Sequence, residues 1–264
     1  QPVPFGLNLI FVAEDIEGSN LGVEICEDLW TPIPPSSHQA IRGATLLANL
    51  SASNEVIGKA AYRRQLVANQ SGRCMAAYLY SSAGVSESST DLVFSGHCLI
   101  AENGTILAES KRFQRADVLE ITDVDLGRLQ LDRVRTGTFG DANYYEPQLD
   151  DFRLCRFRLE PKRASTRLRR WIDPHPFVPK GQEQLRERCE EIFGAQVAAL
   201  SQRVVQLGQP TLSIGISGGL DSTLALLVAC KTVDALGWPR TRVRALTMPG
   251  FGTTTRTLTN AQQL

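Results

Sequence analysis

A short loop with two adjacent glycines, Ser217–Ser222, separates a strand-like run from a helix-like run. The run before it, residues 211–216, is apolar and typical of a strand, and residues 222–236 follow a helical pattern. Residues 243–248 are again strand-like. A strand, a helix and a second strand in such close succession form a βαβ unit, which requires a parallel sheet. The sequence therefore predicts an α/β fold around this loop.

The same loop is suited to bind phosphate. A strand that leads through a Gly-Gly turn into a helix aims several backbone amides at one point, and the helix dipole adds partial positive charge there. Gly218 and Gly219 leave room for an anion to approach the backbone. The loop contains no lysine, so it is not a Walker A loop, and its glycine spacing is not that of a G-x-G-x-x-G fingerprint. A plain βα turn capped by serine or aspartate is the alternative.

With Asp221 and Ser222 after the glycines, the loop resembles that of the ATP pyrophosphatases, which carry S-G-G-x-D-S. The resemblance implies that ATP is cut between its α and β phosphates and that a nitrogen or sulfur nucleophile then displaces AMP from an activated acceptor. It also implies that Asp221 helps to hold Mg²⁺, with ATP and Mg²⁺ bound as a substrate complex and no tightly bound prosthetic group. The ATP-binding residues that it implies are Gly215, Ile216, Ser217, Gly218, Gly219, Leu220, Asp221 and Ser222.

Two flanking segments indicate which branch of this group the chain is similar to. Met248–Thr255 has the sequence M-P-G-F-G-T-T-T, which resembles the segment that shapes the ATP side of the site in NAD synthetases. His175–Pro179, H-P-F-V-P, resembles the entry into the synthetase domain of the glutamine-dependent form. Ligases that form GMP or thiolate tRNA share the loop and are the alternative, which the M-P-G-F segment disfavours.

A cysteine ends the strand-like run 21–26 in the first half of the chain. A sharp turn there exposes a nucleophile beside backbone amides, although a lone cysteine at a strand end is also a common core residue. The string Glu24–Trp30, E-I-C-E-D-L-W, resembles the nucleophile segment of the nitrilase-type amidase domain that glutamine-dependent NAD synthetases carry. Three further segments match in the same order: 49–54, 84–91 and 100–104.

The resemblance implies that Cys26 attacks the side-chain amide of glutamine, that ammonia leaves, and that water then hydrolyses the thioester. It also implies that Ser53 and Lys59 bind the glutamine, with Glu27 as a weaker candidate for the same pocket. Lys59 stands where relatives often carry arginine, and a lysine cannot make the bidentate pair that arginine makes with a carboxylate. From the residues alone, Lys59 can equally be a solvated helix lysine.

The hydrophobic pattern predicts the other elements. A helix containing Val56 and Ile57 is expected after a cap at Ser53 or Asn54. Asn103-Gly104 between two apolar runs predicts a hairpin of strands 97–100 and 105–108. Further strands are expected at 45–50, 74–80 and 118–121, and a long helix at 185–207.

The organisation expected from these patterns is an amidase domain at 1–140, a linker at 141–180 and an ATP-binding synthetase domain at 181–264. The expected fold is α/β: the C-terminal part of a nitrilase-like α-β-β-α sandwich, then the start of a Rossmann-like parallel sheet. The linker is rich in proline, and its run from Arg153 to Arg170 holds eight cations against Glu160 alone. The run is expected to be a solvated linker, and a nucleic-acid patch is the alternative.

Composition indicates which partners and which cellular compartment to expect. Lys plus Arg and Asp plus Glu are both 28, so the net charge is zero, which argues against a general nucleic-acid binder. No apolar run approaches the ~18 residues that cross a bilayer, so no membrane partner is expected. Six scattered cysteines without C-x-x-C pairs argue for free thiols and a cytoplasmic protein, with disulfides as the alternative. The expected partners are glutamine, deamido-NAD and ATP, in a homo-oligomer when full length.

The amidase family also uses a glutamate base and a lysine, both before the cysteine. Glu14, Glu17 and Glu24 precede Cys26, but none matches the family motifs, and no lysine precedes Lys59. We therefore expect a fragment of a glutamine-dependent enzyme, lacking the front of the amidase domain and the back of the synthetase domain, and inactive in isolation. A non-catalytic nucleotide-binding piece is the alternative of a different class.

Overall fold

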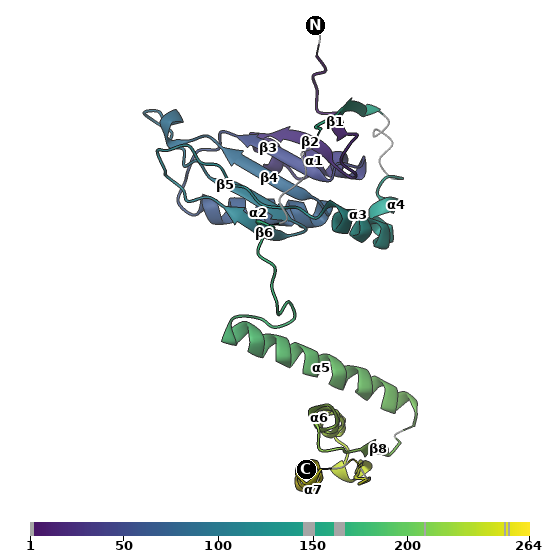
Figure 1. The fold of residues 1–264 in the computed structure, drawn as a ribbon. Helices are drawn as coiled ribbons and strands as arrows, with labels where there is room; N and C mark the ends of the chain where they lie inside the picture. Colours follow the sequence, from purple (N-terminus) through teal and green to yellow (C-terminus); the bar gives the residue numbers. More distant parts are fainter. Residues whose placement is uncertain (1–2, 145–150, 161–166, 209, 251, 253) are drawn as a thin grey trace. The chain divides into compact units, whose positions relative to one another are not determined.

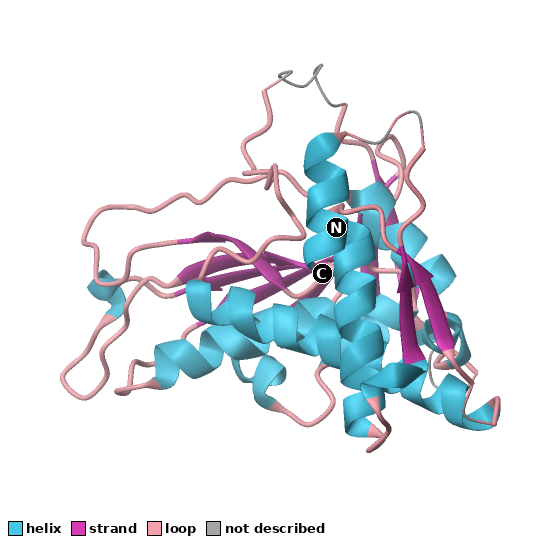
Figure 2. Cartoon of the chain, turned by 90° about the horizontal axis from the view of Figure 1, so that it is seen from below, coloured by secondary structure: helices cyan, strands magenta, loops and turns pink. Residues whose placement is uncertain are grey.

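A computed structural model describes residues 3–144, 151–160, 167–208, 210–250, 252 and 254–264. The chain divides into two compact units, Gln1–Ile172 and Asp173–Leu264 (Figure 1). Both units combine helices and strands, and Figure 2 shows the helices and strands of the whole chain, so the α/β class predicted from the sequence is confirmed. The division falls inside the predicted linker, and the predicted domain limits themselves stay predictions.

The first unit contains one large sheet and several helices. Its strands are β1 (Leu9–Ala13), β2 (Asn20–Ile25), β3 (Leu46–Ser51), β4 (Ala77–Ser82), β5 (Cys98–Glu102), β6 (Thr105–Glu109) and β7 (Arg153–Phe157). Its helices are α1 (Pro35–Ile41), α2 (Lys59–Cys74), α3 (Leu126–Arg135) and α4 (Gly137–Asp141), with 3-10 turns η1 (Cys26–Trp30) and η2 (Val85–Glu87).

These strands pair into a mixed sheet in the order β6-β5-β4-β3-β2-β1-β7. The three central strands β2, β3 and β4 run parallel, since Leu21 pairs with Leu46 and Leu46 pairs with Ala77. β1 and β5 run antiparallel to their central neighbours. The central strands therefore end at one edge of the sheet, and the carboxyl ends of parallel strands are where α/β sheets bind ligands.

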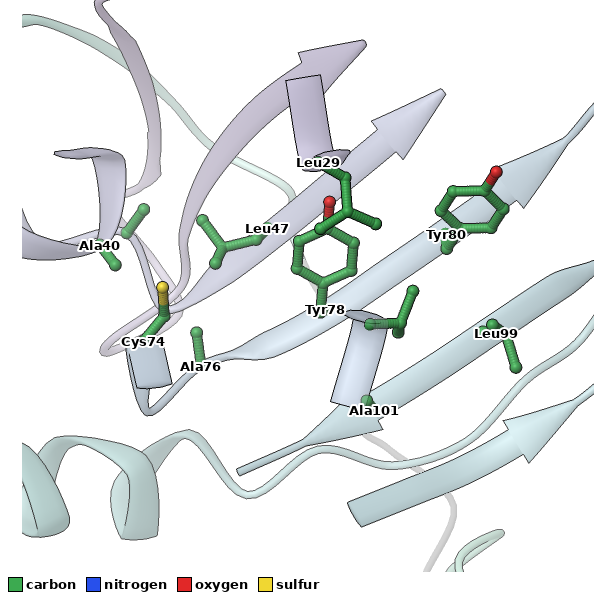
Figure 3. Close-up of a cluster of buried hydrophobic side chains, with 11 residues drawn as sticks. Leu29, Ala40, Leu47, Cys74, Ala76, Tyr78, Tyr80, Leu99 and Ala101 are labelled. Carbon is green, nitrogen blue, oxygen red and sulfur yellow. The ribbon is translucent and has the colours of Figure 1, made fainter. Parts of the chain in front are cut away.

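One face of the sheet packs against α1 and α2. Alternate strand residues such as Leu47, Tyr78 and Leu99 are fully buried, and they cluster with Ala40 of α1 and Val67 of α2 (Figure 3). Burying each large apolar side chain contributes about 1.5–3 kcal/mol, so this cluster holds the helices on the sheet. The strand residues between them face the other way, and Ile25, Leu50 and Leu79 are exposed on that opposite face.

Several predicted elements are confirmed. β2 and β3 fall within one residue of the strands expected at 21–26 and 45–50. β5 and β6 form the expected hairpin, and the backbone φ angles of Asn103 and Gly104 are +45° and +87°. A type I′ turn requires positive φ at both central residues, and asparagine and glycine tolerate it best.

The helix expected around Val56 and Ile57 begins later than predicted. α2 starts at Lys59, after Gly58 with φ of +84°, and neither Ser53 nor Asn54 caps it. The backbone N–H of Glu55 donates to the carbonyl of Val93 at 2.7 Å, which holds this segment as a loop. Val56 and Ile57 are consequently exposed instead of lining an amphipathic helix face.

Two other strand predictions need correction. Residues 118–121 form no strand: they follow the edge strand β6 without a neighbour to pair with, and Leu119 and Ile121 are exposed. The strand expected at 74–80 begins only at Ala77, because Cys74 is the last residue of α2 and Met75 turns the chain with φ of +45°.

Strands β1 and β7 were not predicted. They pair parallel, with Phe11 opposite Cys155, so part of the predicted linker is a strand of the first unit. Most β7 side chains are exposed, so its sequence has no apolar alternation that would indicate a strand. Pro147, Pro161, Lys162 and Arg163 of the predicted linker lie outside the described residues.

The second unit contains α5 (Gln182–Gln206), β8 (Leu212–Gly215), α6 (Leu220–Ala235), the 3-10 turn η4 (Arg240–Arg242), β9 (Val243–Leu246) and α7 (Thr255–Gln263). β8 and β9 pair parallel, which confirms the predicted βαβ unit. Phe251 and Thr253 of the M-P-G-F segment lie outside the described residues. All six cysteines are free thiols. None of the described helices has the length and apolar character that a bilayer crossing requires.

Candidate functional site

Cys26 lies at the sharp turn where β2 ends. Its φ angle is +50°, a left-handed conformation that non-glycine residues rarely adopt, and its side chain is half-buried. The carboxylate of Asp28 accepts the backbone N–H of Ile25 at 2.8 Å, which fixes the turn. The sharp turn expected at the end of this strand is therefore present, with Cys26 in it.

The predicted glutamine-binding residues gather near the same edge. Ser53 follows β3 and is buried, whereas Glu27 is exposed in the turn after Cys26. Lys59 begins α2, and its Nζ lies 5.3 Å from the ring centroid of Trp30, the last residue of η1. Because β2 and β3 run parallel, the turn after β2 and the loop after β3 are neighbours. The sheet thus brings the four predicted residues to one region.

Lys59 is not a freely solvated helix lysine. Its Nζ donates to the backbone carbonyl of Asn54 at 3.0 Å and to the side-chain oxygen of Asn54 at 3.1 Å. An ammonium group has three donors, so one is left after the bonds to Asn54. The contact with the Trp30 ring adds a cation–π attraction. The cation is therefore held at the strand ends with a donor available for a carboxylate.

Of the glutamates before Cys26, two are engaged elsewhere. Glu24 is fully buried on the helix-covered face, where it accepts the hydroxyl of Tyr78 and, at 2.8 Å, the backbone N–H of Ser36. Burial, reinforced by the Glu24 charge, raises the pKa of Tyr78 well above its usual range. Glu14 is paired with Arg156 at 3.7 Å. These contacts support the prediction that neither glutamate acts on the Cys26 thiol.

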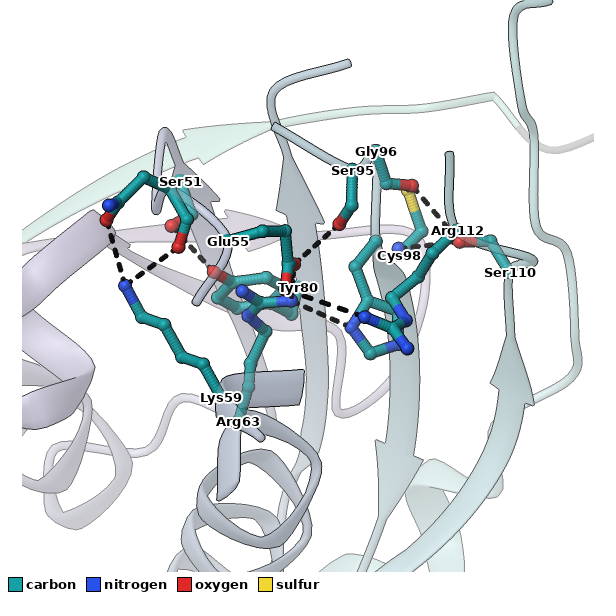
Figure 4. A network of polar contacts seen from close by, with 12 residues as sticks. Ser51, Glu55, Lys59, Arg63, Tyr80, Ser95, Gly96, Cys98, Ser110 and Arg112 are labelled. Carbon is teal, nitrogen blue, oxygen red and sulfur yellow. Dashed lines mark hydrogen bonds and ion pairs between the residues drawn. The ribbon is translucent and has the colours of Figure 1, made fainter. Parts of the chain in front are cut away.

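A polar network beneath Lys59 was not predicted (Figure 4). Arg63, one helical turn after Lys59, is fully buried, and its Nη1 donates to Glu55 at 2.6 Å and to His97 Nδ1 at 3.0 Å. Since arginine only donates, His97 must be neutral with its proton on Nε2, which lies 3.0 Å from Glu109. Burial lowers the pKa of His97 despite that contact. The sequence alone gives one sign of this network, which is that Lys59 and Arg63 are four residues apart and so share one face of α2.

The same network anchors the loop that carries Ser53. Burial acts to raise the pKa of Glu55, but hydrogen bonds from Ser95 and Arg63 outweigh it and leave that pKa lowered. The carboxylate is therefore ionised and accepts Ser95 at 2.6 Å. An ionised buried carboxylate with charge-assisted bonds holds its segment firmly.

The predicted phosphate loop is folded around its own serines. The Ser222 hydroxyl accepts the backbone N–H of Ser217 at 3.3 Å and donates to the carbonyl of Gly219 at 3.1 Å. The Ser217 hydroxyl accepts the N–H of Gly219 at 3.3 Å. Gly218 has φ of +77°, which only glycine adopts without strain. Two backbone amides of the loop thus donate to its own serine hydroxyls at the start of α6, where the helix N-terminus favours an anion.

A cavity of about 600 Å³ adjoins this loop. Gly218, Gly219 and Leu220 of the predicted set line it. Gly215 ends β8, and Ile216 is buried, so these two hold the loop in place and do not line the cavity. α7 contributes further lining residues that were not predicted to bind a ligand: Arg256, Thr257 and Asn260.

Asp221 lies exposed in the first turn of α6, beside the phosphate loop. Among the residues that the structure describes, no three or more His, Cys, Asp or Glu side chains cluster as a metal site. Mg²⁺ is commonly held by one or two carboxylates together with substrate phosphates and waters, so one carboxylate at a phosphate loop fits that ion. The fit depends on bound nucleotide supplying the remaining oxygens.

Several cations of the basic run are paired within the first unit. Arg170 Nη1 lies 2.9 Å from the buried carboxylate of Glu102. Arg156 and Arg158 both approach Glu14, at 3.7 and 3.8 Å. These contacts favour a structural role for the run over the alternative of a nucleic-acid patch.

Comparison with known proteins agrees with the motifs. The NAD synthase family model matches residues 192–264. The glutamine-dependent NAD(+) synthetase of Mycobacterium leprae is 46% identical over 262 residues, which are 99% of this chain and 38% of that protein. The corresponding protein of Mycobacterium tuberculosis H37Rv is 45% identical over 263 residues, 99% of this chain and 39% of its own length. The chain thus spans under two-fifths of the relatives it matches.

A solved structure of the glutamine-dependent NAD+ synthetase from Acinetobacter baumannii in complex with ADP also matches, at 21% identity. The match covers 95% of this chain and 37% of that chain, with a TM-score of 0.40. The resemblance inferred from the motifs is confirmed by the sequence identity to the mycobacterial proteins.

Proposed function

We propose that this chain, which is homologous to glutamine-dependent NAD synthetases over 99% of its length, supplies the glutamine-hydrolysing cysteine and the ATP-binding loop of such an enzyme. The full reaction would convert deamido-NAD, ATP and glutamine into NAD, AMP, pyrophosphate and glutamate. The observation that carries the proposal is the left-handed turn at Cys26, which lies at the end of β2 and opens the 3-10 turn whose last residue, Trp30, contacts Lys59.

In the amidase half, the thiolate of Cys26 attacks the side-chain amide carbon of glutamine. The carbon–nitrogen bond then breaks, and ammonia leaves after its nitrogen takes up a proton. Water hydrolyses the thioester to glutamate and returns the thiol. Lys59 binds the substrate carboxylate through the donor that its bonds to Asn54 leave over, with Ser53 and Glu27 as further contacts.

In the synthetase half, the residues around Gly218 and Gly219 bind the phosphates of ATP. The hydroxyls of Ser217 and Ser222 hold the phosphate oxygens, and the N-terminus of α6 favours the negative charge. Arg256, across the cavity, adds a cation. When Mg²⁺ is bound with ATP, it offsets charge on the phosphates, with Asp221 as its protein ligand.

The experiment that tests this function supplies the full-length protein with ATP, deamido-NAD and either glutamine or ammonium. We expect NAD, AMP and pyrophosphate in equal amounts with both nitrogen donors. Parallel reactions contain the acceptors of GMP-forming and tRNA-thiolating ligases. Turnover of one of those acceptors, with none of deamido-NAD, would contradict the proposal and favour another ligase that shares the loop.

A further inference from the structure

Asn49 lies beside the candidate nucleophile, on the neighbouring strand. It is a residue of β3, paired in register with Glu24 of β2 and Tyr80 of β4. Its side chain is 1% exposed, on the face of the sheet that the helices cover. Cys26 follows two residues after Glu24, at the point where β2 leaves the sheet. Asn49 is thus a buried amide next to the turn that carries the thiol.

Both main-chain polar groups of Cys26 bond to this one side chain. The backbone N–H of Cys26 donates to Asn49 Oδ1 at 3.1 Å. Asn49 Nδ2 donates to the carbonyl of Cys26 at 3.3 Å. At a strand end the backbone loses its ladder partners, and a buried polar group left unpaired there is destabilising. The amide therefore replaces, at Cys26, the pairing that β3 provides along the rest of β2.

The conformation of Cys26 makes this support necessary. A non-glycine residue with φ of +50° is strained and persists only where the surroundings hold it. Asp28 fixes the residue before it through the N–H of Ile25, and Asn49 fixes Cys26 itself. The backbone angles of Cys26 set the direction of its Cα–Cβ bond, so the hydrogen bonds with Asn49 and Asp28 limit the positions that the thiol can take.

We propose that Asn49 is the positioning residue for the Cys26 nucleophile. It is buried and acts through the backbone of Cys26, and it does not contact the substrate itself. The proposal rests on the proposed function, since it concerns the same glutamine site. A misplacement of a reacting atom by about 1 Å can cost on the order of 100-fold in rate, so loss of the Asn49 hydrogen bonds should be visible in turnover.

The test compares the full-length protein with the variants Asn49→Ala and Asn49→Asp. Gln70→Ala is the matched control, because Gln70 is also a buried amide of this unit and bonds to Ser36, Ser37 and Cys74. Four quantities are measured: NAD formation with glutamine, NAD formation with ammonium, the rate at which iodoacetamide alkylates Cys26, and the melting temperature. Mass spectrometry of the Cys26 peptide separates this thiol from the other cysteines.

For Asn49→Ala we expect kcat with glutamine to fall about 10- to 100-fold, with a smaller change in KM. Alkylation of Cys26 should slow, while NAD formation with ammonium stays within about twofold of the parent protein, since only the amidase site is disturbed. Asn49→Asp keeps an acceptor for the Cys26 N–H and loses the donor to the Cys26 carbonyl. Its kcat with glutamine should therefore lie between those of the parent protein and Asn49→Ala. If Asn49→Ala does not fold, Asn49→Asp alone is compared with the parent protein. Gln70→Ala should lower the melting temperature without changing either rate.

Wild-type alkylation and turnover in both Asn49 variants would overturn the proposal. It would also be overturned if the glutamine and ammonium rates fell together, or if Gln70→Ala lost glutamine turnover as strongly. Failure of the proposed function gives a different result. If Cys26 is not the nucleophile, the parent protein still uses glutamine after Cys26 has been completely alkylated. That result depends only on Cys26 and is independent of Asn49.

Discussion

A Cβ atom added at Gly218 would overlap the carbonyl oxygen of Thr257, far inside any allowed contact distance. The glycine of the phosphate loop thus packs directly against the backbone of α7. The side-chain amide of Asn260 also reaches the carbonyl of Gly218, at 3.4 Å. The loop and α7, which line the same cavity, are therefore held together by backbone contact, and any side chain at Gly218 must separate them.

We expect Gly218→Ala to weaken ATP binding by at least about tenfold, because the left-handed φ alone costs on the order of 1 kcal/mol and the clash adds to it. Binding of ATP is measured by calorimetry on the full-length protein, and glutamine hydrolysis should remain. Gly194→Ala in α5 is the control, since nothing lies within 4 Å of a Cβ added there. Unchanged ATP affinity in Gly218→Ala would contradict the contact with Thr257.

Lys59→Met should raise the KM for glutamine about tenfold or more, because it removes the cation that we assign to the substrate carboxylate. Steady-state kinetics with glutamine measure the change, and the rate with ammonium should stay the same. Gln65→Met, at an exposed position of the same helix, is the control. If the KM for glutamine stays at the parent value, Lys59 does not bind the substrate and has only a structural role.

The buried His97 should make the first unit sensitive to mild acid. Burial lowers its pKa in the folded chain, whereas the unfolded residue binds a proton near pH 6.5. The unfolded state therefore binds more protons below about pH 6.5, so stability is full above that pH and is lost as the pH falls. Melting temperatures between pH 8 and 5 should show this loss.

His97→Gln should remove the acid step in that window, because a glutamine can still accept from Arg63 and donate to Glu109 without titrating there. His38→Gln serves as the control from the same unit. Glu55 and Glu109, whose pKa values are also lowered, lose their contribution only at more acidic pH. An equally steep decline between pH 6.5 and 5 in His97→Gln would show that another group is responsible.

Arg133 of α3 joins the ends of two other helices. Its guanidinium donates to four backbone carbonyls near the ends of α1 and α2: those of Ala40, Ala44, Cys74 and Met75. Arg133→Met removes these four hydrogen bonds, although the Ala40 carbonyl keeps the N–H of Gly43 as a donor, and should lower the free energy of unfolding by about 2–4 kcal/mol. Urea denaturation measures the loss. Arg135→Met, on the exposed side of the same helix, should change it by less than about 0.5 kcal/mol.

Sequence patterns predicted the elements whose contacts are local. The hairpin at Asn103-Gly104 and the βαβ unit around Gly218 follow from turn chemistry and hydrophobic period, and both are confirmed. The strand β7 was not predicted, because its register comes from a partner more than 140 residues away, Phe11 opposite Cys155, and its own side chains stay exposed. The start of α2 was misplaced because a distant carbonyl, that of Val93, holds the preceding loop.

The residues of the candidate site likewise fall into those that the sequence indicates and those that only the fold brings together. Cys26 and the phosphate loop are contiguous strings, so the sequence alone indicates them. The support for Cys26 comes from Asn49 across the sheet, and the anchoring of the Ser53 loop comes from Arg63 and Glu55. Asn49 begins the matched segment 49–54, but its contact with Cys26 depends on the pairing of β2 with β3, and the contact of Arg63 with Glu55 depends on the packing of α2.

The most direct test of the account replaces Cys26 with alanine in the full-length protein and measures NAD formation with glutamine and with ammonium in parallel. Cys98→Ser, at another half-buried cysteine of the same unit, is the control for loss of a thiol. The account predicts that Cys26→Ala abolishes NAD formation from glutamine and retains the rate from ammonium, while Cys98→Ser retains both. Glutamine-driven NAD formation at the parent rate in Cys26→Ala would contradict it.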